Sequence, residues 1–242
     1  MAIYIKAIAV CVLLFASAMC ALIGGWFPVF TWESGKGDAV RPSIPSEIDG
    51  GGASVMNAEQ IDIYLFQRVV STNSGTKTST FAKPGDVHWA CSSVRDRFAT
   101  AMAFTTLGWV MGFVGVVATV FSPYLVGPNF IIDTLFFGHR RIAEFVGVAF
   151  SVLTNIVLVV VWNLALDLRS NIQCDDGNDS APDGNFYSGN TFRSEGYSVS
   201  GGLEMIIAAW ILSLIAVFLH VLTFTESGAE QEGATRQSRR FH

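Results

Sequence analysis

The chain alternates between four long apolar blocks and polar segments. The blocks cover residues 7–30, 99–121, 142–168 and 203–224. Residues 99–121 contain neither a charge nor a proline, and a helix of that length is about 35 Å long at about 1.5 Å per residue. The hydrocarbon core of a bilayer is about 30 Å thick. The pattern therefore predicts four membrane-spanning helices.

The order of these blocks divides the chain into eight segments. We predict transmembrane helices at 1–31, 93–121, 142–168 and 203–225, outer loops at 32–92 and 169–202, a connection at 122–141 and a tail at 226–242. The first block contains Ala16-Ser17-Ala18, which resembles a signal-peptide cleavage site, but its apolar run continues to Phe30. We therefore favour an uncleaved span. The connection is too poor in apolar residues to cross the bilayer and is predicted to hold a short interfacial helix.

The composition supports the membrane class. Hydrophobic residues make up 51% of the chain, and the mean hydropathy is +0.44. The net charge is -5 and no run of basic residues is present, which argues against nucleic acid as a partner. The chain carries no motif for a metal, a nucleotide or a hydrolase nucleophile, so we expect no cofactor and no enzymatic activity.

Small and polar residues within the spans point to contacts between helices. Gly108 and Gly112 are four residues apart and share one helix face, which permits close approach of another helix. That helix belongs either to the same chain or to a second copy. Asn155 and Asn163 interrupt the third span. They are predicted to bond neighbouring helices, with a transport pathway as the alternative.

Titratable residues lie towards the ends of the last two spans. Glu144 and Asp167 are expected close enough to the ends to reach water, and His220 is expected at the interface. Ser151, Asp167 and His220 are the residue types that an intramembrane hydrolase would combine. Counting along the spans puts them at different depths, which argues against such a site.

The first outer loop is predicted to contain folded structure. Residues 61–70 are rich in β-branched and aromatic residues with partial alternation, which predicts one strand. Residues 71–75 suit a turn, and residues 76–83 suit the return strand of a hairpin. After the loop, Ser93 and Asp96 form a helix-start pattern, so the second helix should begin near Val94.

The second outer loop is acidic and rich in turn-forming residues. Its run of aspartates lacks the alternating spacing and closing glutamate of an EF-hand, so we expect a solvated loop. Asn178 begins the chain's only N-x-S/T sequon, which predicts a glycan if this loop faces a secretory lumen.

The distribution of basic residues predicts the orientation. Four spans place both termini on one side, and we assign that side to the cytosol because short basic segments stay there. The basic residues concerned are Lys6, Arg140, Arg141, Arg236, Arg239 and Arg240. Cys91 and Cys174 then both lie on the outer side. We predict a disulfide between the two outer loops, with two unpaired thiols as the alternative.

One segment carries a family resemblance. Trp89-Ala90-Cys91 is followed by Arg95-Asp96-Arg97-Phe98 at the entry to the second span, and a shorter outer loop carries one cysteine. This arrangement resembles the amastins, four-span surface proteins of kinetoplastid parasites that are distantly similar to claudins. Residues 61–71 lack the two cysteines and the Leu-Trp-Gly core of the usual amastin signature, so the chain is a divergent example.

The resemblance implies a fold and a cellular setting. The fold is an all-α membrane protein with a claudin-like four-transmembrane-helix bundle, topped by a small extracellular β-sheet from both outer loops. The setting is that of a plasma-membrane glycoprotein with no established enzymatic activity. Trp89 would anchor the sheet, and the charged collar of Arg95, Asp96 and Arg97 would fix the second helix at the interface.

Three functions remain to be compared. The favoured one is a structural or contact role at the parasite surface, towards a host membrane, lipid or neighbouring proteins. The alternatives are a channel or transporter and an assembly subunit of a membrane complex. The expected partners are membrane lipids, together with a homo-oligomer or other membrane proteins.

Overall fold

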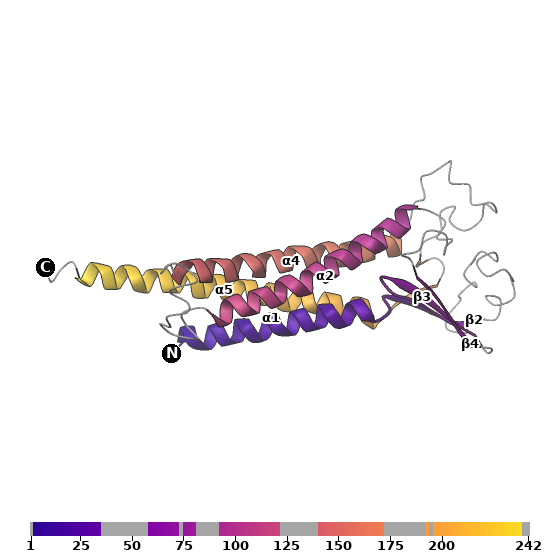
Figure 1. Ribbon diagram of the computed structural model, residues 1–242, viewed down its shortest axis with the longest axis horizontal. Helices are drawn as coiled ribbons and strands as arrows, with labels where there is room; N and C mark the ends of the chain where they lie inside the picture. The colour runs from indigo at the N-terminus through magenta and orange to yellow at the C-terminus, as the bar shows by residue number, and fades with distance from the viewer. Residues whose placement is uncertain are drawn as a thin grey trace. The chain divides into compact units, whose positions relative to one another are not determined.

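A computed structural model describes residues 2–34, 58–72, 75–80, 92–121, 140–171, 192–193 and 196–238. Figure 1 shows the elements in chain order. The helices are α1 (Ala2–Trp26), α2 (Ser92–Val120), α4 (Arg140–Ser170) and α5 (Gly201–Ser238). The strands are β1 (Phe30–Glu33), β2 (Ala58–Ile63), β3 (Gln67–Thr72), β4 (Gly75–Thr80) and β5 (Ser198–Val199).

All four helices are long and apolar enough to cross a membrane. The candidate spans are Ile5–Trp26, Asp96–Val120, Glu144–Ser170 and Gly201–Glu226. Large apolar side chains such as Phe145 and Phe218, 63% and 65% exposed, point away from the protein, which suits a lipid environment. The predicted fold class, four transmembrane helices with a small sheet, is confirmed.

Several helix boundaries differ from the prediction. Helix α1 ends at Trp26 instead of residue 31, because Pro28 follows and residues 30–33 form strand β1. Helix α2 begins at Ser92, so the Ser93 and Asp96 start pattern lies inside the helix; such boundaries commonly shift by one or two residues because first turns are weakly held. Helix α5 runs to Ser238, beyond the predicted end of the span at 225. Residues 122–139, where an interfacial helix was predicted, lie outside the described residues.

The five strands form one antiparallel sheet with the order β4-β3-β2-β1-β5. Strand β1 directly follows α1 and lies between β2 and β5, with Phe30 opposite Ile63 on one side and opposite Val199 on the other. Both outer-loop segments therefore contribute to the sheet, as the family resemblance implied.

The prediction of one strand over residues 61–70 is wrong. The segment holds the end of β2 and the start of β3, separated by a tight turn in which the Tyr64 N–H donates to the Gln67 carbonyl oxygen at 2.8 Å. The turn was invisible in the sequence because Leu65 and Phe66 are strand-type residues, whereas two-residue hairpin turns usually carry Asn-Gly or similar pairs. The predicted hairpin further along is formed by β3 and β4, with Val70 opposite Lys77.

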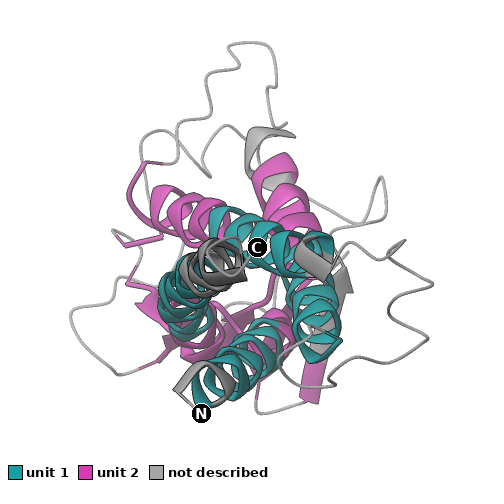
Figure 2. Cartoon of the chain, turned by 90° about the vertical axis from the view of Figure 1, so that its left-hand side faces the viewer, with its two compact units in different colours: residues 1–21, 107–158, 208–242 teal, residues 22–106, 159–207 magenta. Residues whose placement is uncertain are grey.

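The chain divides into two compact units, which Figure 2 colours separately. Unit 1 comprises Met1–Ala21, Leu107–Leu158 and Ala208–His242. Unit 2 comprises Leu22–Thr106 and Val159–Ile207, and it contains the sheet. Each of the four helices contributes one part to unit 1 and one part to unit 2.

Candidate functional site

The largest described core lies in unit 2, where aromatic rings join the sheet to a helix. Phe192 stacks on Phe30 of β1 with ring centroids 5.1 Å apart, and its edge contacts Phe98 of α2 at 6.1 Å. Tyr197 packs at right angles to Phe192 at 5.3 Å. All four residues are buried. Phe98, singled out in the sequence, therefore acts with three residues that the sequence did not single out.

An ion pair joins α2 to α4 within the same unit. The Arg97 Nη1 donates to the Asp167 Oδ2 at 2.6 Å, and the two side chains are 32% and 39% exposed. Partial exposure limits the energy of such a pair to about 0.2–1 kcal/mol. Asp96 is exposed, and the side chain of Arg95 lies outside the described residues. The sequence placed Arg97 and Asp167 near helix ends, but nothing in it identified them as partners.

Two glycines bring the end of α1 to the start of α5, also in unit 2. A Cβ added at Gly24 would lie 2.9 Å from the Gly202 carbonyl oxygen, and one at Gly202 would lie 2.5 Å from the Phe27 carbonyl oxygen. The Gly202 N–H donates to the Pro28 carbonyl oxygen at 2.9 Å. The sequence signal for this contact is two pairs of adjacent glycines, Gly24-Gly25 and Gly201-Gly202. Sequence analysis did not connect them.

The glycine pair of α2 lies in unit 1 and packs against the same chain. A Cβ at Gly108 would lie 3.0 Å from Leu158 Cδ2 of α4, and one at Gly112 would lie 3.0 Å from Ala18 Cβ of α1. These contacts favour packing within the chain over a dimer face.

Polar groups link helices inside unit 1. The Asn155 Nδ2 of α4 donates to the Ser213 Oγ of α5 at 2.8 Å and to the Trp210 carbonyl oxygen at 3.3 Å. The Ser17 Oγ of α1 donates to the Ala209 carbonyl oxygen of α5 at 2.7 Å. Such bonds suit helices that associate in lipid.

Asn163, the second asparagine of the third span, behaves differently. It is exposed and donates to the Val159 carbonyl oxygen of its own helix at 2.8 Å. The expectation of a bond to a neighbouring helix is not met for this residue, because its side chain lies on the outer face of α4.

The expected separation of Ser151 from His220 is wrong. The Ser151 Oγ lies 3.0 Å from the His220 Nδ1 and also donates to the Gly147 carbonyl oxygen at 2.8 Å. Both side chains are buried. Counting residues from predicted ends misjudges depth, because helix ends shift and helices tilt.

Two further titratable residues, Glu144 and Asp167, were expected close enough to the helix ends to reach water. Glu144 is 7% exposed, which corrects the expectation that it reaches water. Asp167 belongs to unit 2 and is bound to Arg97. The Ser151–His220 contact is therefore a buried hydrogen bond between α4 and α5, not part of a set with Asp167.

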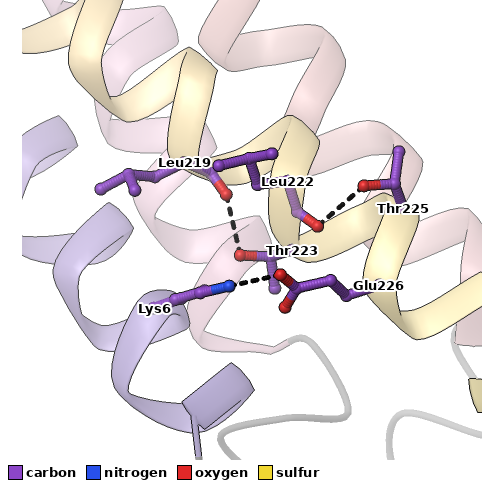
Figure 3. A network of polar contacts seen from close by, with 6 residues as sticks. All are labelled: Lys6, Leu219, Leu222, Thr223, Thr225 and Glu226. Carbon is purple, nitrogen blue, oxygen red and sulfur yellow. Dashed lines mark hydrogen bonds and ion pairs between the residues drawn. The ribbon is translucent and has the colours of Figure 1, made fainter.

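A second ion pair joins the N-terminal part of α1 to the C-terminal part of α5 in unit 1. The Lys6 Nζ lies 2.5 Å from the Glu226 Oε1 (Figure 3). In the same view, Thr223 and Thr225 donate to the carbonyl oxygens of Leu219 and Leu222. These hydroxyl groups add hydrogen bonds to backbone carbonyls within α5, and the ion pair connects this part of α5 to α1.

A comparison with protein families identifies the chain's relatives. Residues 65–219 match the family model described as amastin surface glycoprotein, which covers more than half of the chain. The chain belongs to the amastin family. Among curated proteins, none matches it significantly. The predicted family is thus confirmed, and with four membrane-crossing helices this amastin is a multi-pass membrane protein of the surface glycoprotein family.

Several predicted site residues of this amastin lie outside the described residues: Trp89, Cys91, Cys174 and Asn178. The disulfide, the glycan and the anchoring role of Trp89 remain predictions. Cys11 and Cys20, within the first span, are free thiols. Within the described ranges, no group of three or more histidine, cysteine or acidic residues could hold a metal ion.

Proposed function

We propose that this amastin is a contact protein of the parasite surface, in which the spans serve as an anchor and the sheet serves as the contact surface. The observation that carries the proposal is the construction of unit 2. Its sheet takes strands from both outer segments and rests on a buried aromatic core that includes Phe98 of a spanning helix. A sheet held in this way is a rigid platform, as recognition surfaces generally require.

The polar side chains of the spans support an anchoring role. Asn155, Ser17 and Ser151 each bond to a neighbouring helix or to their own backbone. The proposed contact element is the hairpin of β3 and β4. Strand β4 stands at the edge of the sheet with the polar sequence GTKTST, and Gly75 and Thr76 are exposed.

Topology is the first test. We expect a membrane-impermeant amine reagent applied to intact cells to modify Lys36, Lys77 and Lys83, because all three lie in the first outer segment. Modification only after permeabilisation would place the protein in an internal membrane and favour an assembly subunit instead.

Adhesion is the second test. Cells that express the protein should bind host-cell membranes more strongly than cells that lack it, and Thr76→Arg should reduce the difference. Val12→Ala is the matched control, because Val12 is 60% exposed on a span and faces lipid. Equal adhesion with and without the protein contradicts the contact role.

The second candidate is a channel subunit, which the polar interior of unit 1 favours. Asn155 and Ser213 are bonded to each other, and Ser17, Ser151 and His220 are fully or almost fully buried. A contact protein should give no ion flux in reconstituted vesicles. Flux that Asn155→Leu abolishes and Asn163→Leu leaves intact would establish the channel, because Asn155 bonds to a neighbouring helix whereas Asn163 bonds within its own helix.

A further inference from the structure

The turn between β2 and β3 is unusual for a turn exposed to water. It is closed by the hydrogen bond from the Tyr64 N–H to the Gln67 carbonyl oxygen, and its two central residues are Leu65 and Phe66. Leu65 is 2% exposed. Hairpin turns that face water normally carry glycine, asparagine or aspartate at these positions. Leu65 belongs to the buried core of unit 2, so the protein itself accounts for its apolar side chain. Phe66 is only partly buried, and it is the turn residue that indicates an apolar setting outside the protein.

Aromatic contacts place this turn beside the end of a membrane span. The Phe66 ring lies 5.6 Å from the ring of Trp26 at an angle of 70°, and Tyr64 lies 6.0 Å from Phe66. Trp26 is the last residue of both α1 and its candidate span. Trp26 and Phe27 are 64% and 54% exposed. We name Trp26, Phe27, Tyr64 and Phe66 the aromatic rim.

The chemistry of the rim matches the boundary between lipid and water. Tryptophan and tyrosine concentrate at that boundary because each combines an apolar ring with a polar group. Burial, with a smaller contribution from the negative charge of Asp62, raises the pKa of the Tyr64 phenol. Tyr64 therefore stays neutral and brings no charge into the boundary region.

The opposite end of β3 provides an internal contrast. There, the Thr72 Oγ1 donates to the Gly75 carbonyl oxygen at 2.9 Å, and Gly75 has a φ of 142°. Gly75 and Thr76 are exposed. The two ends of β3 lie about 17 Å apart at about 3.3 Å per residue. The β3–β4 turn thus has the composition expected in water, whereas the β2–β3 turn does not.

We propose that the aromatic rim is a bilayer-binding surface, in which the β2–β3 turn sits among the lipid headgroups and first acyl carbons beside the end of α1. The partner is the bilayer that the helices cross. The rim holds the near end of the sheet against the lipid and leaves the β3–β4 turn in water.

Photo-crosslinking to lipid tests this proposal on the full-length protein. The protein is reconstituted into phosphatidylcholine vesicles that contain a lipid with a diazirine near the glycerol backbone, with no other protein present. Adducts are mapped by mass spectrometry after illumination. We expect adducts on residues 64–66 severalfold above those on the tryptic peptide 69–77, which carries the other turn. Adducts on Trp26 serve as the positive control.

Three variants sharpen the comparison. Phe66→Ser should lower the adducts on residues 64–66 severalfold, Phe66→Trp should keep them, and Thr76→Ser should change nothing. Adducts on Trp26 together with none on residues 64–66 would overturn the proposal and indicate that protein covers the turn. Should Phe66→Ser fail to fold, the wild-type comparison of the two turns still decides.

Discussion

The contact of Gly202 with the segment after α1 makes a sharp prediction for Gly202→Ala. The added Cβ would lie 2.5 Å from the Phe27 carbonyl oxygen and 2.7 Å from the Pro28 carbonyl oxygen. Both are backbone atoms, so no side chain can rotate away. Moving α5 to relieve the clash would lengthen the 2.9 Å hydrogen bond from the Gly202 N–H to Pro28.

The expected loss follows from three contributions. Overpacking costs about 1–3 kcal/mol, and a weakened backbone hydrogen bond adds about 1 kcal/mol. Alanine in place of glycine returns at most about 1 kcal/mol through helix propensity. The net destabilisation is about 1–3 kcal/mol. For a chain of this size that corresponds to a Tm about 2–12 °C lower.

Thermal unfolding of the purified protein in nanodiscs measures this loss. The matched control is Gly201→Ala, because a Cβ at Gly201 meets nothing within 4 Å. The control should stay within about 0.5 kcal/mol of wild type, as expected where a substitution makes no new contact. If both variants unfold at the same temperature, the inferred close approach of α1 and α5 is refuted.

Three further predictions concern the outer segments and the collar. A double-mutant cycle with Arg97→Gln and Asp167→Asn should give a coupling of about 0.2–1 kcal/mol that falls as salt is added, and no coupling would contradict the ion pair. Peptide mapping without reduction should find Cys91 joined to Cys174, whereas two free thiols would exclude the bond. Glycosidase treatment should increase the electrophoretic mobility of the cell-expressed protein, and Asn178→Gln should abolish that shift.

The spans were predictable because membrane crossing depends on length and apolar content, both of which can be read from one segment alone. The sheet was only partly predictable. Strands β1 and β5 have four and two residues, too few to show an alternating pattern. The β2–β3 turn was hidden because its central residues, Leu65 and Phe66, are apolar, whereas sequence rules for hairpin turns look for glycine or asparagine.

The contacts between elements were not predictable from the chain alone. Arg97 with Asp167 and Ser151 with His220 are pairs separated by 70 and 69 positions. Whether such residues meet depends on which helices are neighbours and how each is rotated about its axis. The sequence supplied the residue types, but a shift of one residue turns a helical side chain by about 100°.

The two units hold their helices together by partly shared means. In unit 1, Gly108 and Gly112 bring helix surfaces close, and Asn155 adds a polar bond. Lipid offers little hydrophobic gain for helix association, so close packing and polar bonds must supply the free energy of association. In unit 2, Gly24 and Gly202 make a similar close contact, and a buried aromatic core around Phe98 and Phe192 also joins the sheet to α2. Unit 2 should therefore be sensitive in two ways: to added bulk at Gly202 and to the loss of core volume, where Phe98→Ala should cost about 3–5 kcal/mol.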